Sequence, residues 1–276
     1  MTVIDSKTFD EERALYESNG VHAVNCRFDG PEDGESAFKE SRDIKAEKCY
    51  FNLRYPFWHT HTLSVLECEM TSLCRAALWY SDNITIRNSL LHGIKALREC
   101  SDIVIENTDI ISPEFGWFSK NIKMTDCKAE GEYFMLRAEN LIFENVEFKG
   151  KYSFQYIKNC TFRNCIFDTK DAFWHAENVR VENCTVKGEY LAWYSKNIVF
   201  DNCKISGTQP LCYCDGLKLI SCTMDEADLS FEKSEVEAEL LSPVISIINP
   251  KSGIIKVPSF EELILTDKTE CKIITE

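Results

Sequence analysis

The sequence is poor in basic residues relative to its acidic ones. Among its 276 residues, 45 are acidic and 31 are basic, so the formal net charge at pH 7 is −14. Binding to nucleic acid or to an anionic membrane depends on clusters of Lys and Arg that neutralise phosphate groups. The charge balance therefore argues against nucleic acid and membranes as partners and is typical of a soluble protein.

Long apolar runs and a leader sequence are missing as well. No stretch approaches the roughly 18 consecutive apolar residues that a membrane-spanning helix needs. The first residues, Met1 to Phe9, contain no basic region followed by an apolar region, so we expect no signal peptide. Both absences lead us to expect a cytoplasmic protein whose 14 cysteines are reduced thiols.

The cysteines and histidines lack the spacing of a metal site. Structural zinc and iron–sulfur centres favour the C-x-x-C spacing, whereas the closest pair here is Cys212-x-Cys214. His59 and His61 lie two residues apart, and the sequence suggests no third ligand beside them. We therefore expect neither a metal nor another cofactor.

What the sequence does contain is a 19-residue repeat. One position recurs through successive copies, and we number it column 0: Asn83, Asp102, Asn121, Asn140, Asn159, Asn178, Asn197 and Gly216. Columns 1 and 3 are apolar and alternate with polar residues, which is the period-2 pattern of a half-buried strand. Column 5 is mostly Asn, which tolerates left-handed backbone in a turn and can form amide ladders between stacked coils. Column 10 is often Gly, which marks a second turn where we expect positive φ.

The cysteines follow the same repeat. Column 6 holds eight of the 14: Cys26, Cys49, Cys68, Cys127, Cys165, Cys184, Cys203 and Cys222. A free thiol at one inward position behaves as a small apolar side chain. We therefore expect a cysteine ladder in the core rather than a set of metal ligands.

These patterns predict an all-β fold, a single right-handed parallel β-helix of about eleven coils with three short strands per coil. We expect the β-helix to occupy residues 20–234. Residues 1–19 are expected to form an N-terminal cap with a short amphipathic helix, because Thr8 and Glu11 match a capping box.

The repeat fades after residue 234, so residues 235–276 are expected to form a C-terminal cap. The apolar segments Val244–Ile248 and Ile254–Val257 are separated by the turn-like sequence Asn249-Pro-Lys-Ser-Gly253. Two apolar runs joined by such a turn are typical of a β-hairpin.

The third strand, at columns 12 to 17, presents the face that is most unusual in composition. If side chains alternate there, columns 12, 14 and 16 point outward and column 15 places Trp117, Trp174 and Trp193 inside. The outward set is then strongly aromatic across four coils. From it we predict these ligand-binding residues: Tyr133, Arg137, Tyr152, Phe154, Tyr156, Phe173, Tyr190 and Tyr194. A contiguous aromatic patch usually marks a binding surface, and tyrosines offer flat faces and hydroxyl groups to sugars.

Three ionisable residues on this face are candidate catalytic residues. Glycoside hydrolysis needs two carboxyl groups about 5 Å or about 6.5–9.5 Å apart, and Asp171 and Glu189 from adjacent coils match that spacing. His175 shares the face with Asp171, roughly 13 Å along an extended strand. These residues would flank a substrate, and whether the protein is an enzyme stays open.

Several segments carry a family resemblance, and they are Leu53-Arg-Tyr-Pro-Phe-Trp-His59, Thr169-Lys-Asp-Ala-Phe-Trp-His175, Gly188-Glu-Tyr-Leu-Ala-Trp-Tyr194 and Asn249-Pro-Lys-Ser-Gly253. They resemble a bacterial domain-of-unknown-function family of right-handed parallel β-helix proteins, some of which carry a hydrogenase label. The resemblance implies the fold and supplies no catalytic residues, and the cysteine spacing does not support a hydrogenase. The coil is also similar to that of pectate-lyase-type enzymes, whose sites lie on an outer sheet face.

Two hypotheses follow for the aromatic face. The leading one is that a carbohydrate or glycoconjugate binds there, with its modification left open. The rival is a non-enzymatic interaction scaffold or homodimer that buries the same face against another protein.

Overall fold

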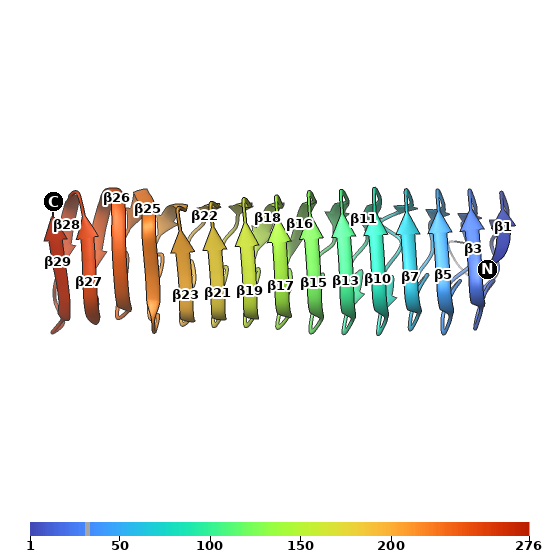
Figure 1. Cartoon of the computed structure of the whole chain (residues 1–276), viewed down its shortest axis with the longest axis horizontal. Coiled ribbons are helices and arrows are strands. Elements are labelled where there is room, and N and C mark those ends of the chain that lie inside the picture. The colour runs from blue at the N-terminus through green and yellow to red at the C-terminus, as the bar shows by residue number, and fades with distance from the viewer. Residues whose placement is uncertain (31–33, 276) are drawn as a thin grey trace. The chain divides into compact units, whose positions relative to one another are not determined.

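The computed structural model describes residues 1–30 and 34–275, which form strands and turns with no helix among them. The chain divides into two compact units, Met1–Glu139 and Asn140–Glu276. Each unit winds as a parallel β-solenoid, and Figure 1 shows the strands of each unit side by side in chain order. Without helices, the described residues contain no helical segment that could cross a membrane.

In unit 1, the first strand of each coil, except for β1, runs from the residue before column 0 to column 4. These strands are β1 (Thr2–Asp5), β3 (Asn19–Val24), β5 (Arg42–Glu47), β7 (His61–Leu66), β10 (Asp82–Arg87), β13 (Ser101–Glu106) and β15 (Lys120–Thr125). Each pairs in parallel with its counterpart one coil away, so that Ile84 lies opposite Ile103 and Ile103 opposite Ile122. The strands predicted from columns 1 and 3 are therefore confirmed.

A second, shorter strand follows the Asn turn in each coil of unit 1. These strands are β2 (Thr8–Phe9), β4 (Arg27–Phe28), β6 (Tyr50–Phe51), β8 (Glu69–Met70), β11 (Leu90–His92), β14 (Asp109–Ile111) and β16 (Lys128–Glu132). Two further short strands, β9 (Leu78–Trp79) and β12 (Leu97–Arg98), pair with each other in a separate small sheet.

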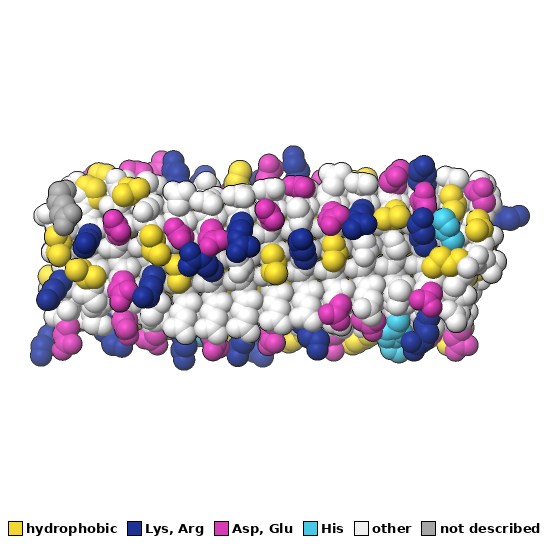
Figure 2. Space-filling model, in the orientation of Figure 1, with side chains coloured by type: hydrophobic (Ala, Val, Ile, Leu, Met, Phe, Trp, Pro, Cys, Tyr) yellow, Lys and Arg dark blue, Asp and Glu magenta, His cyan; other side chains and the backbone are white. Residues whose placement is uncertain are grey.

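Unit 2 repeats this plan. Its first strands are β17 (Glu139–Glu144), β19 (Lys158–Arg163), β21 (Glu177–Glu182), β23 (Lys196–Asp201), β25 (Leu217–Asp228), β26 (Glu235–Ile248), β27 (Ser252–Val257) and β29 (Glu270–Thr275). Its shorter strands are β18 (Glu147–Lys151), β20 (Ile166–Asp168), β22 (Thr185–Lys187), β24 (Lys204–Thr208) and β28 (Phe260–Ile264). On the outer face of the first strands, positive and negative side chains are interspersed in each unit (Figure 2).

The core of each unit is made of stacked columns of identical or similar side chains. In unit 2, Phe154 and Phe173 stack at 5.2 Å between ring centroids, and both are fully buried. All cysteines are free thiols and all but Cys271 are buried, which confirms the predicted cysteine ladder. Burial raises the pKa of the Cys100 thiol to about 12, as expected for a side chain that serves as packing.

Asparagine ladders close the turns, as column 5 predicted. Asn88 and Asn107 have φ of 52° and 45°, and the amide of Asn107 donates to Asn88 Oδ1 at 2.8 Å. In unit 2 the amide of Asn202 donates to Asn183 in the same way, at 2.8 Å. Asn therefore supplies both the left-handed turn residue and a bond between coils.

The predicted N-terminal helix is wrong. Residues 2–5 and 8–9 form strands, and Thr8 pairs with Arg27 instead of capping a helix. Farther along, the backbone N–H of Leu15 donates to the carbonyl of Ala37 at 2.8 Å. Hydrogen bonds to the next coil thus outweigh the weak local helical pattern, because an isolated helix this short is marginal in water.

The predicted C-terminal hairpin is also wrong. β26 and β27 pair in parallel, with Glu235 opposite Ser252, so the chain completes another coil between them. Because residues at both ends wind as coils, the two units together have about 14 turns, in place of the eleven expected.

Apart from β9 and β12, the third segment of the described coils is a run of turns rather than a strand. In unit 2, columns 12, 14 and 16 all have left-handed backbone; Tyr190, Ala192 and Tyr194, for example, have φ of 56°, 59° and 59°. A left-handed residue at every second position breaks the alternation of a strand. Columns 13 and 14 therefore both point into the core, and columns 15 and 16 both point outward.

This geometry overturns part of the predicted face. Phe154 and Phe173 were expected on the outside as ligand-binding residues, yet both are 0% exposed. Trp174 and Trp193 were expected inside, yet both are half-exposed at the surface. The strand rule failed because it assumes that every residue has extended backbone.

Candidate functional site

A stack of aromatic rings runs along the outside of unit 2 at column 16. Its members are Tyr156, His175, Tyr194 and Tyr213, one from each of four successive coils. Successive ring centroids are 4.7, 5.1 and 4.9 Å apart, and the ring planes are inclined by 11°, 12° and 17°. Tyr156 and Tyr194 are 41% and 44% exposed. The coil spacing of the solenoid thus sets the spacing of the rings.

A second stack lies beside it at column 15. Trp174 and Trp193 are parallel within 6°, with centroids 5.5 Å apart, and Tyr190 packs edge-on against Trp193 at 5.3 Å. We call the column 16 stack together with Trp174, Trp193 and Tyr190 the aromatic ledge.

Hydrogen bonds to the backbone hold the ledge in place. The indole N–H of Trp174 donates to the carbonyl of Tyr190 at 2.6 Å, and that of Trp193 donates to the carbonyl of Gln209 at 2.7 Å. The Gln155 amide makes the same contact with the carbonyl of Asp171, at 3.0 Å. Each of these three column 15 side chains therefore helps to fix the turn of the following coil.

The stacking decides which part of each ring a ligand can reach. Rings that lie face to face along the solenoid cover each other's faces, so their edges and hydroxyl groups remain for contact with a partner. A sugar ring packs on an aromatic face, and the inner rings of this stack have none free. The ledge is instead a stiff strip of ring edges. At its far end the Tyr213 hydroxyl donates to Glu232 at 2.9 Å.

Charged residues flank the ledge on both sides. Column 18 holds Lys158, Glu177, Lys196 and Asp215 in successive coils, so its charges alternate in sign. Within the chain, Lys158 lies 3.3 Å from Glu177. Column 11 carries the ion pair between Lys170 and Glu189, at 2.6 Å.

Asp171 is the least solvated ionisable group of the candidate site. Its residue is 7% exposed, and among the described residues no side chain or backbone group donates a hydrogen bond to its carboxylate. The pKa of Asp171 is raised, mainly by burial. The charge of Lys170 lowers this pKa and the charge of Glu189 raises it, each by less than burial does. A buried carboxylate without a donor is costly, and such groups are concentrated at functional sites.

The three candidate catalytic residues occupy different environments. His175 is exposed within the ring stack, and burial lowers its pKa, so its imidazole is mainly neutral at pH 7. Glu189 is exposed and paired with Lys170. Among the described residues, no hydrogen bond or ion pair joins Asp171, His175 and Glu189 to one another. Their catalytic role stays a prediction.

The remaining predicted ligand-binding residues are distributed over both units. Tyr133 and Arg137 are exposed and belong to unit 1, where the Tyr133 carbonyl accepts a hydrogen bond from Trp117. Tyr152, half-buried in unit 2, precedes Asp171 in column 12. Sequence reasoning missed Tyr213 as part of the stack, although its place in column 16 of the repeat was visible.

Comparisons with known proteins identify a family. A family model described as "Protein of unknown function (DUF3737)" matches residues 2–275. Among solved structures, PfbA, a surface adhesin of Streptococcus pneumoniae, is similar with a TM-score of 0.47 and 9% sequence identity, over 95% of this chain and 85% of that chain. No curated protein matches the chain.

Proposed function

Since the chain belongs to the DUF3737 family, whose description assigns no activity, we propose its function from its own surface: it is a binding scaffold whose aromatic ledge pairs with a second copy of the chain. The observation that carries this proposal is the alternating charge along column 18 beside a strip of ring edges. Such a surface is complementary to itself.

The composition of the ledge suits a protein interface. The centres of protein interfaces are enriched in Tyr and Trp and depleted of charged residues. Besides Tyr156 and Tyr194, the ledge contains Tyr190, Tyr213, Trp174 and Trp193. Its histidine, His175, is mainly neutral at pH 7 because burial lowers its pKa. Hydrogen bonds and stacking hold these rings in place before binding, so little side-chain entropy is lost on association.

The charges define how two copies would meet. A two-fold axis across the ledge places the two solenoids antiparallel and reverses the order of column 18 in the second copy. Lys158 then faces Asp215 of the partner subunit, and Glu177 faces Lys196 of the partner subunit. The same operation brings Lys170 opposite Glu189 of the partner subunit in column 11. All of these contacts join opposite charges.

A charge-swap series tests this arrangement. We expect light scattering to give the mass of a dimer for the wild type, and we expect Glu177→Lys or Lys196→Glu to weaken the dimer by roughly tenfold or more, since each places like charges opposite each other twice. The combined Glu177→Lys/Lys196→Glu variant restores opposite charges and should recover the dimer. Circular dichroism confirms that each variant is folded.

Two results would contradict this arrangement. A wild type that is monomeric at all concentrations overturns the self-pairing, and a combined swap as weak as the two single swaps together overturns the two-fold arrangement. The Tyr156→Ala/Tyr194→Ala variant removes two exposed rings without touching the charges, and it should be a monomer.

A second candidate function is binding of a carbohydrate or glycoconjugate on the same surface. Asp171 favours it, because a buried carboxylate without a donor is matched by the hydroxyl groups of a sugar. With the ring faces covered, such a ligand would be held by hydrogen bonds more than by stacking. A glycan-binding screen in which Asp171→Asn abolishes a signal, with the mass unchanged, would select this function over self-pairing.

A further inference from the structure

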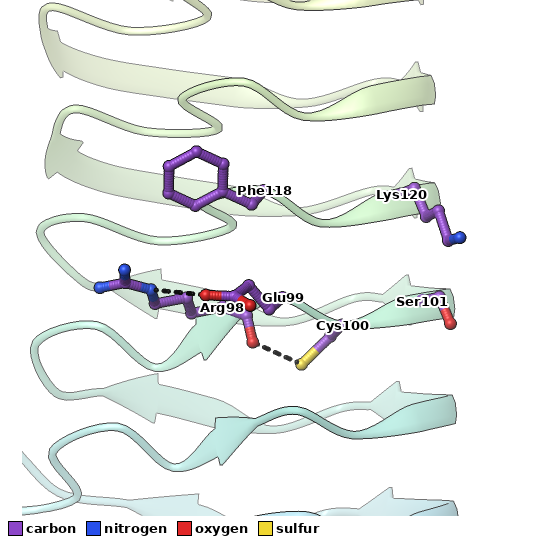
Figure 3. A pocket seen from close by; sticks show the side chains of 6 residues that line it. All are labelled: Arg98, Glu99, Cys100, Ser101, Phe118 and Lys120. Atoms are coloured by element: carbon purple, nitrogen blue, oxygen red, sulfur yellow. Dashed lines mark hydrogen bonds and ion pairs between the residues drawn. The ribbon is translucent and has the colours of Figure 1, made fainter.

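A pocket of about 650 Å³ lies on unit 1, between the coil of Arg98 and the coil of Phe118 (Figure 3). It is lined by Arg98, Glu99, Cys100, Ser101, Phe118 and Lys120. The volume is within the range of small-molecule sites, about 300–1,000 Å³. The aromatic ledge belongs to unit 2, so this pocket is a separate feature.

The pocket contains an arginine that is held in place before any ligand binds. The Arg98 guanidinium lies between two indole rings, 5.0 Å from the centroid of Trp79 and 5.7 Å from that of Trp117. Both indoles are fixed by hydrogen bonds of 2.6 Å, from Trp79 to the Lys95 carbonyl and from Trp117 to the Tyr133 carbonyl. Cation–π contacts of this kind orient the guanidinium and reduce the entropy lost when it binds.

Most hydrogen-bond donors of Arg98 remain open. Its Nε lies 3.4 Å from Glu99 Oε1, and no described residue accepts a hydrogen bond from its two terminal nitrogens. The side chain is 28% exposed, so the terminal nitrogens can be reached from the pocket. An arginine fork with free terminal nitrogens matches the two oxygens of a carboxylate.

A second positive charge lines the other end of the pocket. Ser101 and Lys120 are opposite each other in the pairing of β13 with β15. Figure 3 shows Arg98 and Phe118 toward one end, Ser101 and Lys120 toward the other, and Glu99 between them. Among the described residues, Lys120 has no ion-pair partner, and Figure 3 shows its side chain extending away from Arg98 at that end of the pocket.

The pocket arises where the aromatic column is interrupted. In unit 2, column 16 is filled by consecutive rings, whereas in unit 1 the sequence Tyr80, Glu99, Phe118 places a carboxylate between two aromatic coils. Tyr80 and Phe118 are thus two coils apart, roughly 9.6 Å. Phe118 is 43% exposed and offers an apolar wall beside the charged groups.

The lining restricts the ligand. Arg98 and Lys120 call for an anion, but the Glu99 carboxylate and the net charge of −14 oppose a ligand with several negative charges. Glu99 instead accepts hydrogen bonds from hydroxyl groups, and Phe118 packs against C–H groups. We propose that this pocket binds a small organic acid that carries one carboxylate and several hydroxyl groups, the chemistry of a sugar acid.

Three probes that share one sugar ring test the proposal by isothermal titration calorimetry. Glucuronate has one carboxylate, glucose has no charge, and glucose 6-phosphate approaches two negative charges at neutral pH. We expect glucuronate to bind at least about tenfold more tightly than either of the others, because a charge-assisted contact to arginine is lost in glucose and Glu99 opposes the second charge. Equal binding of glucuronate and glucose, or tighter binding of glucose 6-phosphate, would overturn the proposal.

Variants locate the site. Arg98→Gln and Lys120→Gln should each weaken glucuronate binding by roughly tenfold, whereas Lys123→Gln, an exposed lysine on the same strand outside the pocket, should leave it unchanged. Because Arg98 also packs between two indoles, its variant is checked by thermal unfolding, and Lys120→Gln provides the test that does not depend on that packing. Binding that survives both pocket variants, or that Lys123→Gln weakens equally, places the ligand elsewhere. Neither result depends on pairing through the ledge.

Discussion

At the scale of single residues, Asp171 is a side chain that we expect to reduce the stability of the fold at neutral pH. The residue is 7% exposed, no described residue donates a hydrogen bond to its carboxylate, and partial burial raises its pKa. The folded protein therefore holds a proton on Asp171 at pH values where the unfolded chain has released it. Stability falls as pH rises through that window and stays reduced above it.

Replacing Asp171 with the nearly isosteric Asn should remove this effect. We expect Asp171→Asn to unfold at a higher temperature than the wild type at pH 7, with the difference shrinking as pH falls toward the ordinary pKa near 3.8. Thermal unfolding from pH 4 to pH 8 measures the difference. Asp168→Asn, at an exposed acid three residues earlier, serves as the control and should change little. Equal curves for Asp171→Asn and wild type at every pH would show that the carboxylate is solvated or paired.

At the scale of the element, the first two strands of each coil could be predicted from sequence and the third segment could not. Columns 1 and 3 are apolar and extended, so periodicity and burial agree. In the third segment, residues such as Tyr190, Phe173 and His175 have left-handed backbone, which bulky side chains rarely adopt. Nothing in their composition signals it. Tyr156 and Tyr194 were placed at the surface, as found, while Phe154 and Phe173 were placed on the wrong side.

The turn before this segment allows little room for a side chain. Positive φ was expected for the column 10 glycines, and Gly207 has it at 128°. Gly188 does not, and there the structure gives a steric reason instead. A Cβ on Gly188 would lie 1.9 Å from the carbonyl oxygen of Thr169 in the preceding coil. Glycine is therefore needed for the close approach of two backbones.

We expect Gly188→Ala to lower the free energy of unfolding by about 2–3 kcal/mol, because one coil must move away from the next. Urea unfolding followed by circular dichroism measures this loss. Gly20→Ala is the matched control: its Cβ would meet no atom closer than 3.9 Å, and only its φ of 67° opposes the substitution. That variant should lose about 1 kcal/mol. Losses of similar size at both sites would contradict the steric explanation.

At the scale of the whole molecule, two opposing electrostatic effects act on self-association. Each copy carries a net charge of −14, so two copies repel at long range. The paired charges proposed along column 18 attract only at contact. Salt shortens the Debye length from about 30 Å at 0.01 M to about 8 Å at 0.15 M, which screens the long-range repulsion first.

We therefore expect the dimer to become stronger as ionic strength rises from about 0.01 M to about 0.15 M. Sedimentation equilibrium at several salt concentrations gives the dissociation constant. A dissociation constant that rises steadily over this range would mean that the contact charges dominate. A dissociation constant that does not change with salt would mean that the affinity comes from the apolar ring edges.

The spacing of the paired residues also bears on how the chain reaches its fold. In the central coils a residue pairs with the one 19 positions later, as Val179 does with Ile198, and 19 of 276 residues is about 0.07 of the chain length. Relative contact orders of that size belong to helical bundles, whereas all-β sandwiches lie near 0.16–0.22. Although every described element is a strand, pairing does not require segments that are far apart in the sequence, because each strand pairs with the preceding coil. We therefore expect folding by nucleation and stepwise growth, at rates closer to those of a helical bundle than of a β-sandwich, which stopped-flow refolding would measure.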